Sequence, residues 1–185
     1  MFEFVISPED RIVNGAVYTP KHIRNYIISK SFHTKRHALR LIKLADLSCG
    51  CGGFLFDSAK QLKSITGKSY FHIFKHQIFG LDIQRYSITR TKLLLTILAV
   101  TSGEDRKEFE FNLIENDALT YIWRQRVRNG FDIIVGNPPY VAAKHLDDET
   151  KEKLKAWEVC RIGNQDLYIP FFQIGIENLA INGIL

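Results

Sequence analysis

The chain has 185 residues, of which 45% are hydrophobic and 24% are charged, and its formal net charge is +5. This composition excludes a disordered, collagen-like or disulfide-rich protein, and it predicts a globular chain with a substantial core. Because no apolar run approaches the roughly 18 residues of a membrane span and no secretory signal is recognisable, we expect a cytoplasmic protein with no membrane partner.

The N-terminal segment, residues 1–38, is expected to be helical and to begin a strongly basic stretch. Between Lys21 and Lys43 the sequence has seven Lys or Arg residues, three His residues and no acid. On charge alone, solvated helix faces and contact with a polyanion are both consistent with this stretch. A second basic cluster consists of Arg124, Arg126 and Arg128. The three histidines have no acid or Cys partner at ligand spacing, so we interpret His22, His33 and His37 as surface residues and expect no metal site.

A strand is predicted from Leu39 to Ala45, and it leads through Asp46 into a glycine-rich turn that spans residues 48–53. Glycines there let the backbone turn tightly and approach a ligand, and the helix predicted at residues 54–65 offers free N–H donors at its start. Leu55 stands where the dinucleotide pattern requires Gly, and Leu62 stands where the phosphate-loop pattern requires Gly. The loop therefore fits a phosphate-poor ligand, although a plain glycine-rich turn is the simpler alternative.

Acids follow the next two predicted strands. Asp82 ends a strand predicted at residues 77–81, before a helix at residues 87–101, and an acid at this place can accept both hydroxyls of a ribose. A turn or helix-capping role for Asp82 is equally consistent with the pattern. Asp117 follows a strand at residues 109–114, where its carboxylate can accept a hydrogen bond from an exocyclic amine. Its alternative role is to cap a short helix predicted at residues 119–127.

The most specific motif is Asn137-Pro138-Pro139-Tyr140, which follows a strand predicted at residues 131–135. Two prolines stop the strand ladder and stiffen the turn, because neither supplies an N–H and each fixes its φ angle. The Asn137 and Pro138 carbonyls stay free of regular structure, and Tyr140 offers a flat apolar surface beside them.

The remainder of the chain adds less chemistry to this pattern. The charge-balanced stretch at residues 147–155 is expected to be a mobile loop or a short helix. A last helix is predicted at residues 166–180, and Ile184 would open a fifth strand.

Strands that alternate with helices predict an α/β fold with a doubly wound, mainly parallel sheet. Ligands in such sheets bind beyond the carboxyl ends of the strands. Because the glycine-rich turn, the two acids and the proline turn all lie at such ends, we expect them to form one site.

With these motifs, the chain resembles the S-adenosylmethionine-dependent amino-methyltransferases, and most closely the adenine-N6 DNA methyltransferases of restriction-modification systems with the gamma motif order. Residues 46–54 resemble the family's D-P-x-C-G-S-G-x-F loop, with Leu47 in place of Pro and Cys51 in place of Ser. Residues 137–140 match the N-P-P-Y signature. Residues 15–20 resemble a G-x-[FY]-x-T-P element, and residues 166–172 resemble a D-L-Y-x-x-F element.

The resemblance implies a Rossmann-like methyltransferase fold and roles for particular residues. Asp82 would hold the ribose of the cofactor, Asp117 would read its adenine, and the Asn137 and Pro138 carbonyls would accept hydrogen bonds from the target amino group. The implied cofactor-binding residues are Tyr18, Thr19, Pro20, Asp46, Cys49, Gly50, Gly52, Phe54, Asp82, Ile83, Asp117 and Ala118. The implied catalytic residues are Asn137, Pro138, Pro139 and Tyr140, with Tyr140 stacking on the base.

The implied cofactor is S-adenosyl-L-methionine, and the implied partner is double-stranded DNA with a flipped adenine, with specificity and restriction domains or subunits as further partners. A protein-glutamine or RNA amino-methyltransferase is an alternative, since any planar amide or aromatic amine needs the same two acceptors. We expect residues 39–185 to be a catalytic domain incomplete at its C-terminus, without a target-recognition domain. A cofactor- or DNA-binding fragment that is inactive on its own is therefore a third interpretation.

Overall fold

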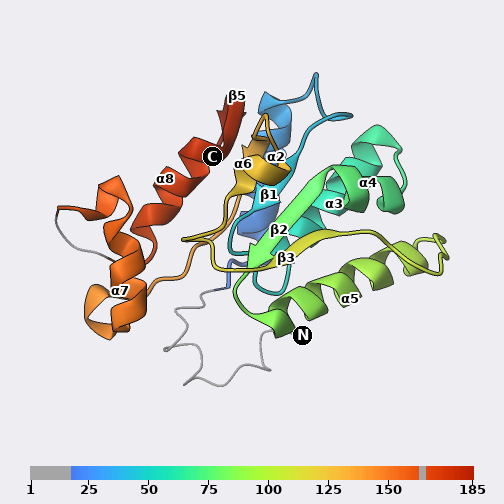
Figure 1. Ribbon diagram of the computed structural model, residues 1–185. Coiled ribbons are helices and arrows are strands. Elements are labelled where there is room, and N and C mark those ends of the chain that lie inside the picture. Colours follow the sequence, from blue (N-terminus) through green and yellow to red (C-terminus); the bar gives the residue numbers. More distant parts are fainter. Residues whose placement is uncertain (1–17, 163–165) are drawn as a thin grey trace.

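The computed structural model describes residues 18–162 and 166–185, and Figure 1 shows a central sheet with helices on both of its faces. The helices are α2 (Lys21–Thr34), α3 (Gly53–Thr66), α4 (Tyr70–His76), α5 (Arg85–Thr101), α6 (Trp123–Arg126), α7 (Asp148–Lys155) and α8 (Ile169–Asn178). The strands are β1 (Leu44–Asp46), β2 (Ile78–Asp82), β3 (Asn112–Glu115), β4 (Phe131–Ile134) and β5 (Leu179–Ile184). No helix in this part of the chain is both long and apolar enough to cross a membrane.

The sheet is parallel in every pairing, and its strand order is β3-β2-β1-β4-β5. Asp46 is in register with Gly80, and Asp82 is in register with Glu115. The carboxyl ends of neighbouring strands therefore meet at one edge, as the α/β pattern of the sequence predicts. The predicted fold class is confirmed.

Two hydrophobic clusters, one on each face of the sheet, form the core. The first contains buried side chains of α2, α3, α4 and α5 together with Leu44 and Ile133. The second contains side chains of α6, α7 and α8 together with Ala45 and Ile134. Neighbouring strand residues thus point to opposite clusters, which is the side-chain alternation expected of a strand covered on both sides.

The first predicted strand is wrong over most of its length. Residues 36–41 form turns, and the strand begins only at Leu44. The Gln77 amide donates hydrogen bonds to the carbonyls of Leu39 and Ile42, so these carbonyls are satisfied by a side chain instead of a strand ladder. Leu39 and Ile42 are nevertheless buried, and this explains their apolar character.

Several other elements differ from the sequence prediction. The sequence missed α4, whose N-cap Ser69 accepts a hydrogen bond from the His72 N–H. The third strand begins at Asn112 instead of Phe109, and α6 is shorter than predicted because residues 118–120 form a turn. By contrast, the charge-balanced stretch at residues 147–155 contains α7, in agreement with the expected short helix. The fifth strand begins at Leu179, and its register with β4 is interrupted between the two pairings that join it.

The second basic cluster has a structural role at Arg124. Its guanidinium donates hydrogen bonds to the carbonyls of Glu177 and Leu179, at the end of α8, and to the carbonyl of Arg128. Arg126 donates to the Asn112 side chain. These contacts join α6 to neighbouring elements, so this cluster is not simply a free cationic surface.

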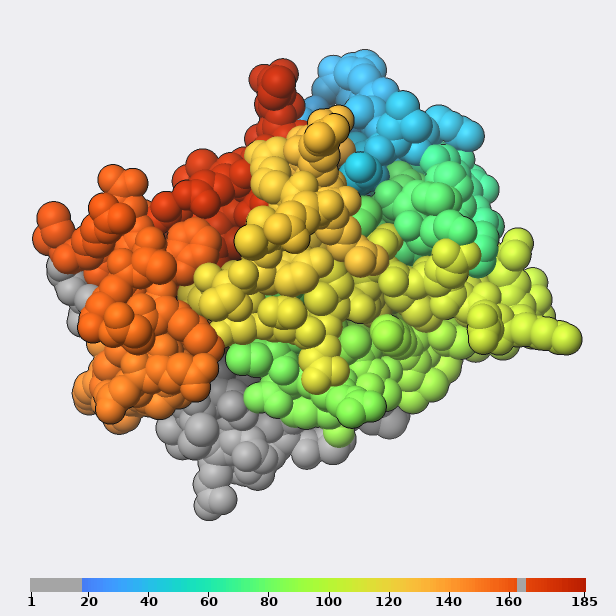
Figure 2. Space-filling view, viewed as in Figure 1, coloured from blue at the N-terminus to red at the C-terminus, as the bar shows by residue number. Residues whose placement is uncertain are grey.

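The segment that contains α7 lies at the side of the molecule. In Figure 2 it forms an orange lobe at the left edge, next to the yellow segment that contains α6. Two hydrogen bonds join the beginning of this segment to its end. The Leu167 N–H donates to the Val141 carbonyl, and the Ala143 N–H donates to the Asp166 carboxylate.

Gly130 provides a test of how tightly β4 packs against the end of α8. Its φ angle is +76°, and a Cβ atom there would lie 2.6 Å from the Asn178 carbonyl oxygen. We expect Gly130→Ala to lower the free energy of unfolding by roughly 2–4 kcal/mol, because it adds backbone strain and a clash with main-chain atoms.

The matched control is Gly103→Ala, since Gly103 has a φ angle of +85° and open space around it. We expect this variant to lose only about 1–2 kcal/mol from backbone strain. Equal losses for the two variants in denaturant unfolding would show that the contact between Gly130 and α8 is looser than described.

Candidate functional site

A cavity of about 810 Å³ lies beyond the carboxyl ends of the strands and contains most of the expected site residues. The expected residues that line it are Tyr18, Thr19, Asp46, Cys49, Gly50, Phe54, Asp82, Ile83, Asp117, Ala118, Asn137 and Pro139. Pro20, Gly52, Pro138 and Tyr140 are outside the described lining. Residues 15–17 of the G-x-[FY]-x-T-P element lie outside the described part of the chain. The structure therefore brings segments from five parts of the sequence to one cavity.

The glycine-rich loop after β1 is held from two sides. The Gly50 N–H donates to the Asp82 carboxylate at 2.8 Å, and the Thr91 hydroxyl of α5 donates to the Gly50 carbonyl at 3.0 Å. Gly50 and Gly52 have φ angles of +51° and +77°. A Cβ atom at Gly52 would lie 2.5 Å from Cγ2 of the buried Thr91. The loop thus needs glycine both for its backbone angles and for its close approach to α5.

Asp82 has the turn and helix-capping role, which is one of the two roles that the sequence left open. It accepts hydrogen bonds from the Gly50 and Gln84 N–H groups and from Ser87, and these stabilise the turn into α5. Burial raises the pKa of Asp82 above its ordinary value of 3.8, while the three hydrogen bonds act in the opposite direction. Since each carboxylate oxygen has two lone pairs, Asp82 retains acceptor capacity toward the cavity.

Asp46 is 2% exposed and lies between the glycine-rich loop and the proline turn. Burial is the main cause that raises its pKa to about 7, and the negative charge of Asp82 adds to this. The Ser48 N–H donates to Asp46 at 3.1 Å and favours the ionised form. A Cβ atom at Gly136 would lie 2.8 Å from the Asp46 carboxylate, so the backbone before Asn137 passes directly beside this acid.

Asp117 also lines the cavity, and its carboxylate has two partners. Its carboxylate accepts from the Leu119 N–H at 2.9 Å and from the Lys153 ammonium of α7 at 3.0 Å. Lys153 also pairs with Glu149 at 2.7 Å, and its hydrogen bonds to Glu149 and Asp117 raise the pKa of the ammonium. The contact with Leu119 stabilises the turn at residues 118–120, and α6 begins only at Trp123, so the helix-capping alternative for Asp117 is wrong. The contact with Lys153 has no counterpart in the sequence motifs.

The proline turn has one side toward the cavity and one side toward solvent. Asn137 and Pro139 line the cavity, whereas Tyr140 is 51% exposed. The Tyr140 ring lies 5.4 Å from the Tyr168 ring, which in turn lies 6.3 Å from the Phe172 ring. The D-L-Y-x-x-F element thus continues the aromatic surface that begins in the proline turn.

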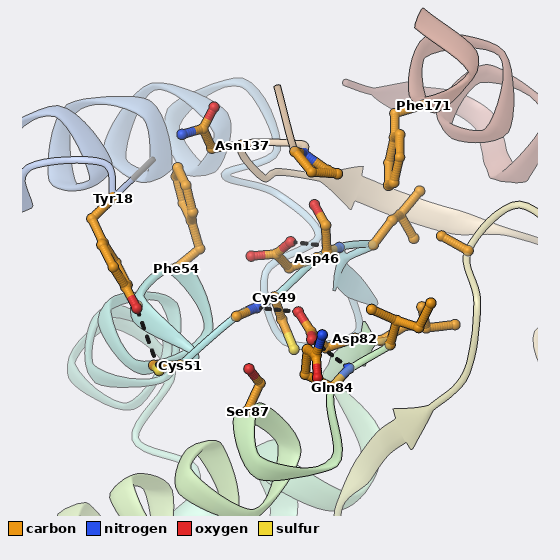
Figure 3. Close-up of a pocket in the computed structure, with 18 of the residues that line it drawn as sticks. Tyr18, Asp46, Cys49, Cys51, Phe54, Asp82, Gln84, Ser87, Asn137 and Phe171 are labelled. Atoms are coloured by element: carbon orange, nitrogen blue, oxygen red, sulfur yellow. Dashed lines mark hydrogen bonds between the residues drawn. The ribbon is translucent and has the colours of Figure 1, made fainter. Parts of the chain in front are cut away.

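Figure 3 shows how the labelled side chains surround Asp46. Tyr18, Phe54 and Asn137 lie on one side of it in this view, and Asp82 and Ser87 lie on the other. The Tyr18 hydroxyl approaches the Cys51 sulfur at 3.9 Å, which joins the segment before α2 to the glycine-rich loop.

Sequence reasoning missed several lining residues outside the motifs. These include Arg24 of α2, Gln84 and Ser87 at the start of α5, and Thr150 of α7. Phe171 of α8 also lines the cavity, and it lies within the D-L-Y-x-x-F element. The positions of Gln84 and Ser87 directly after Asp82 were a usable signal. Arg24 and Thr150 carried none, because their place at the cavity depends on how α2 and α7 pack.

Comparison with known proteins gives one family match. The model of the family described as "Eco57I restriction-modification methylase" matches residues 76–185. The Type II methyltransferase M.BstVI of Geobacillus stearothermophilus is 29% identical over 185 residues, which cover 94% of this chain and 33% of the relative. The chain thus spans about a third of the length of this relative.

Solved structures support the fold. The DrdV–DNA complex superposes with a TM-score of 0.71 at 18% identity, over 94% of this chain and 20% of that chain. An S-adenosylmethionine-dependent methyltransferase from Agrobacterium tumefaciens superposes with a TM-score of 0.50 at 17% identity, over 90% of this chain and 43% of that one. At these identities the likeness establishes the methyltransferase-like fold.

The raised pKa of Asp46 predicts a pH dependence of stability. In the folded protein Asp46 keeps its proton up to about pH 7, whereas the unfolded chain releases it near 3.8. The folded state therefore binds the extra proton between these values, and the contribution of Asp46 to the free energy of unfolding falls as pH rises from about 4 to about 7.

We expect Asp46→Asn to remove this fall, which amounts to roughly 2–4 kcal/mol, when urea unfolding is measured across that pH range. Asp148→Asn is the matched control, because Asp148 is fully exposed on α7 and should leave the pH profile unchanged. A wild-type profile identical to that of Asp46→Asn would contradict the raised pKa.

Proposed function

The chain belongs to the Eco57I restriction-modification methylase family, and from this premise we propose that it transfers a methyl group from S-adenosyl-L-methionine to the N6 amino group of adenine in DNA. The observation that carries the proposal is the shared cavity. Asn137 of the N-P-P-Y turn lines the same cavity as the glycine-rich loop, Asp82 and Asp117.

The residues at the cavity fit the chemistry of this cofactor. When bound, the cofactor supplies an electrophilic methyl group on a sulfonium. Asp82 offers acceptor lone pairs for ribose hydroxyls, and Asp117 offers them for the adenine amino group. Asp46 is a buried carboxyl whose ionised form a neighbouring cation would stabilise, which suits the positively charged amino-acid end of the cofactor.

The proposed catalytic role of the proline turn is to hold the target amine. The lone pair of an exocyclic amine is delocalised into the purine ring, so the amine is a poor nucleophile. The Asn137 side-chain oxygen and the Pro138 carbonyl oxygen would each accept a hydrogen bond from it. Two fixed acceptors favour a pyramidal nitrogen and stabilise the positive charge that grows there during attack.

We propose double-stranded DNA as the partner, with the target adenine flipped out of the helix. A base within a duplex cannot reach the cavity, and flipping costs roughly a few kcal/mol. The exposed rings of Tyr140 and Phe172, with Tyr168 between them, offer a stacking surface that would offset part of this cost. The DNA complex of DrdV, a structural neighbour, supports the same class of partner.

The basic segment from Lys21 to Lys43 is the proposed phosphate contact. Lys21, Lys30 and Arg36 are exposed and suited to this role. Others have internal partners: Lys35 donates to the Asn182 carbonyl, and Arg40 donates to the Thr66 carbonyl. Specificity and restriction domains or subunits remain proposed partners, since M.BstVI is about three times as long as its match to this chain.

A protein-glutamine or RNA amino-methyltransferase is the second candidate, because the two acceptors of the proline turn would serve an amide equally well. The family match and the relative M.BstVI, a Type II methyltransferase, favour DNA. Methyl transfer to a glutamine-containing peptide or to RNA, without transfer to DNA, would reverse this assignment.

The Asn137 side chain gives the sharpest test of the proposed chemistry. We expect Asn137→Ala to lower the rate of methyl transfer to unmethylated duplex DNA by roughly ten- to a hundredfold, because one charge-assisted acceptor is lost. The measurement is transfer of labelled methyl groups by the protein as its gene encodes it. Calorimetric binding of S-adenosylhomocysteine should change little.

The control is Asn129→Ala, since Asn129 is exposed and lies outside the described cavity lining. This variant should retain the wild-type rate. Undiminished methylation of adenine by Asn137→Ala would disprove the catalytic role proposed for the turn.

A further inference from the structure

The proposed cofactor has a carboxylate at its amino-acid end, and the cavity contains few groups that could receive it. The lining acids Asp46, Asp82, Asp117 and Asp147 suit cations, hydroxyls and amines, but their carboxylates repel another carboxylate. A receiving group must therefore be a cation or a set of N–H donors. Lys21, Arg24 and Arg90 are the Lys and Arg residues of the described lining.

Among these cations, Arg24 is fixed in place by two contacts. Its Nε donates to Oδ2 of Asp57 at 2.8 Å, and its Nη1 donates to the Thr19 carbonyl at 2.5 Å. The Asp57 side chain is only 4% exposed and that of Arg24 is 18% exposed. By contrast, Lys21 is exposed at the start of α2. Arg24 is thus a preorganised cation between α2 and α3, whereas Lys21 is free to sample many rotamers.

Gly53 places the guanidinium of Arg24 at the glycine-rich loop. A Cβ atom at Gly53 would lie 3.1 Å from Nε and 3.2 Å from Cζ of Arg24. The absence of a side chain at the first residue of α3 therefore makes room for Arg24 directly after the Gly50–Gly52 turn. The guanidinium lies next to both Thr19 and the loop, and the family resemblance implies that both segments bind the cofactor.

The contacts with Asp57 and Thr19 leave donors of the guanidinium available for a ligand. An arginine side chain has five N–H groups, and the bonds to Asp57 and Thr19 occupy one on Nε and one on Nη1. The planar fork can bind a second carboxylate through its remaining Nη donors. Asp57 also offsets the positive charge of the partly buried guanidinium.

We infer that Arg24 binds the carboxylate of the amino-acid end of S-adenosylmethionine, with Asp57 holding its guanidinium in position. This inference rests on the proposed function, because it assumes that cofactor. It assigns a binding role to a residue outside the glycine-rich loop and the two strand-end acids.

The test compares two ligands that differ only in the carboxylate. Calorimetry on the full chain measures the affinity for S-adenosylhomocysteine and for its decarboxylated analogue, which keeps the amine. We expect the wild-type protein to prefer S-adenosylhomocysteine by roughly ten- to a hundredfold. In Arg24→Met this preference should fall to within about threefold, while affinity for the decarboxylated analogue stays near the wild-type value.

Because Arg24→Met leaves the buried Asp57 without its cation, the double variant Arg24→Met/Asp57→Asn is measured beside it. Thermal unfolding checks that both variants fold. Lys21→Met and Arg90→Met are the matched controls, and each should retain the wild-type preference.

Three results would overturn the inference. In the first, the folded double variant keeps the preference for S-adenosylhomocysteine. In the second, the Arg24 variants lose affinity for both ligands equally, which would mean that Arg24 only holds Thr19 in place. In the third, the preference disappears in Lys21→Met or Arg90→Met, which would show that this residue binds the carboxylate instead of Arg24. If the wild-type protein bound neither ligand, the proposed cofactor itself would be wrong, so this failure is distinct from the other three.

Discussion

The hydrogen bond from the Gly50 N–H to the Asp82 carboxylate joins the ends of β1 and β2, and the geometry of the cavity depends on it. It requires Gly50 to adopt a φ angle of +51°, and it orients Asp82 across the loop. The Thr91 hydroxyl of α5 then holds the Gly50 carbonyl. The peptide groups on both sides of Gly50 are thus held, one by the end of β2 and one by α5, and the loop keeps the shape that lines the cavity.

The proximity of two acids at the strand ends determines the electrostatics of the site. Asp46 and Asp82 are close enough for the charge of one to raise the pKa of the other, and burial acts in the same direction. A cation that entered the cavity would stabilise both carboxylates and favour release of a proton from Asp46. The two acids therefore favour a positively charged group of the ligand beside them.

The sequence predicted the fold class, and most of the site residues expected from it line one cavity, because glycine, acids and prolines at strand ends have strong local requirements. It misplaced the first strand, since the apolar side chains of Leu39 and Ile42 are buried from turns that Gln77 stabilises across 38 and 35 residues of sequence. It missed α4 although Ser69 was a cap signal. Local patterns identify what each segment prefers, but they do not show which distant side chain satisfies a backbone group.

Two ion pairs beside the cavity also could not be predicted from the local sequence. Arg24 pairs with Asp57 across 33 residues, and Lys153 pairs with Asp117 across 36 residues. Both cations come from helices outside the sheet, so no strand register predicts them. Each pair is partly buried, which makes it less sensitive to salt than a surface ion pair and allows it to order its acid before a ligand arrives. The strand ends therefore carry the acids and the turns of the site, while cations from α2 and α7 determine how rigidly Asp57 and Asp117 are held.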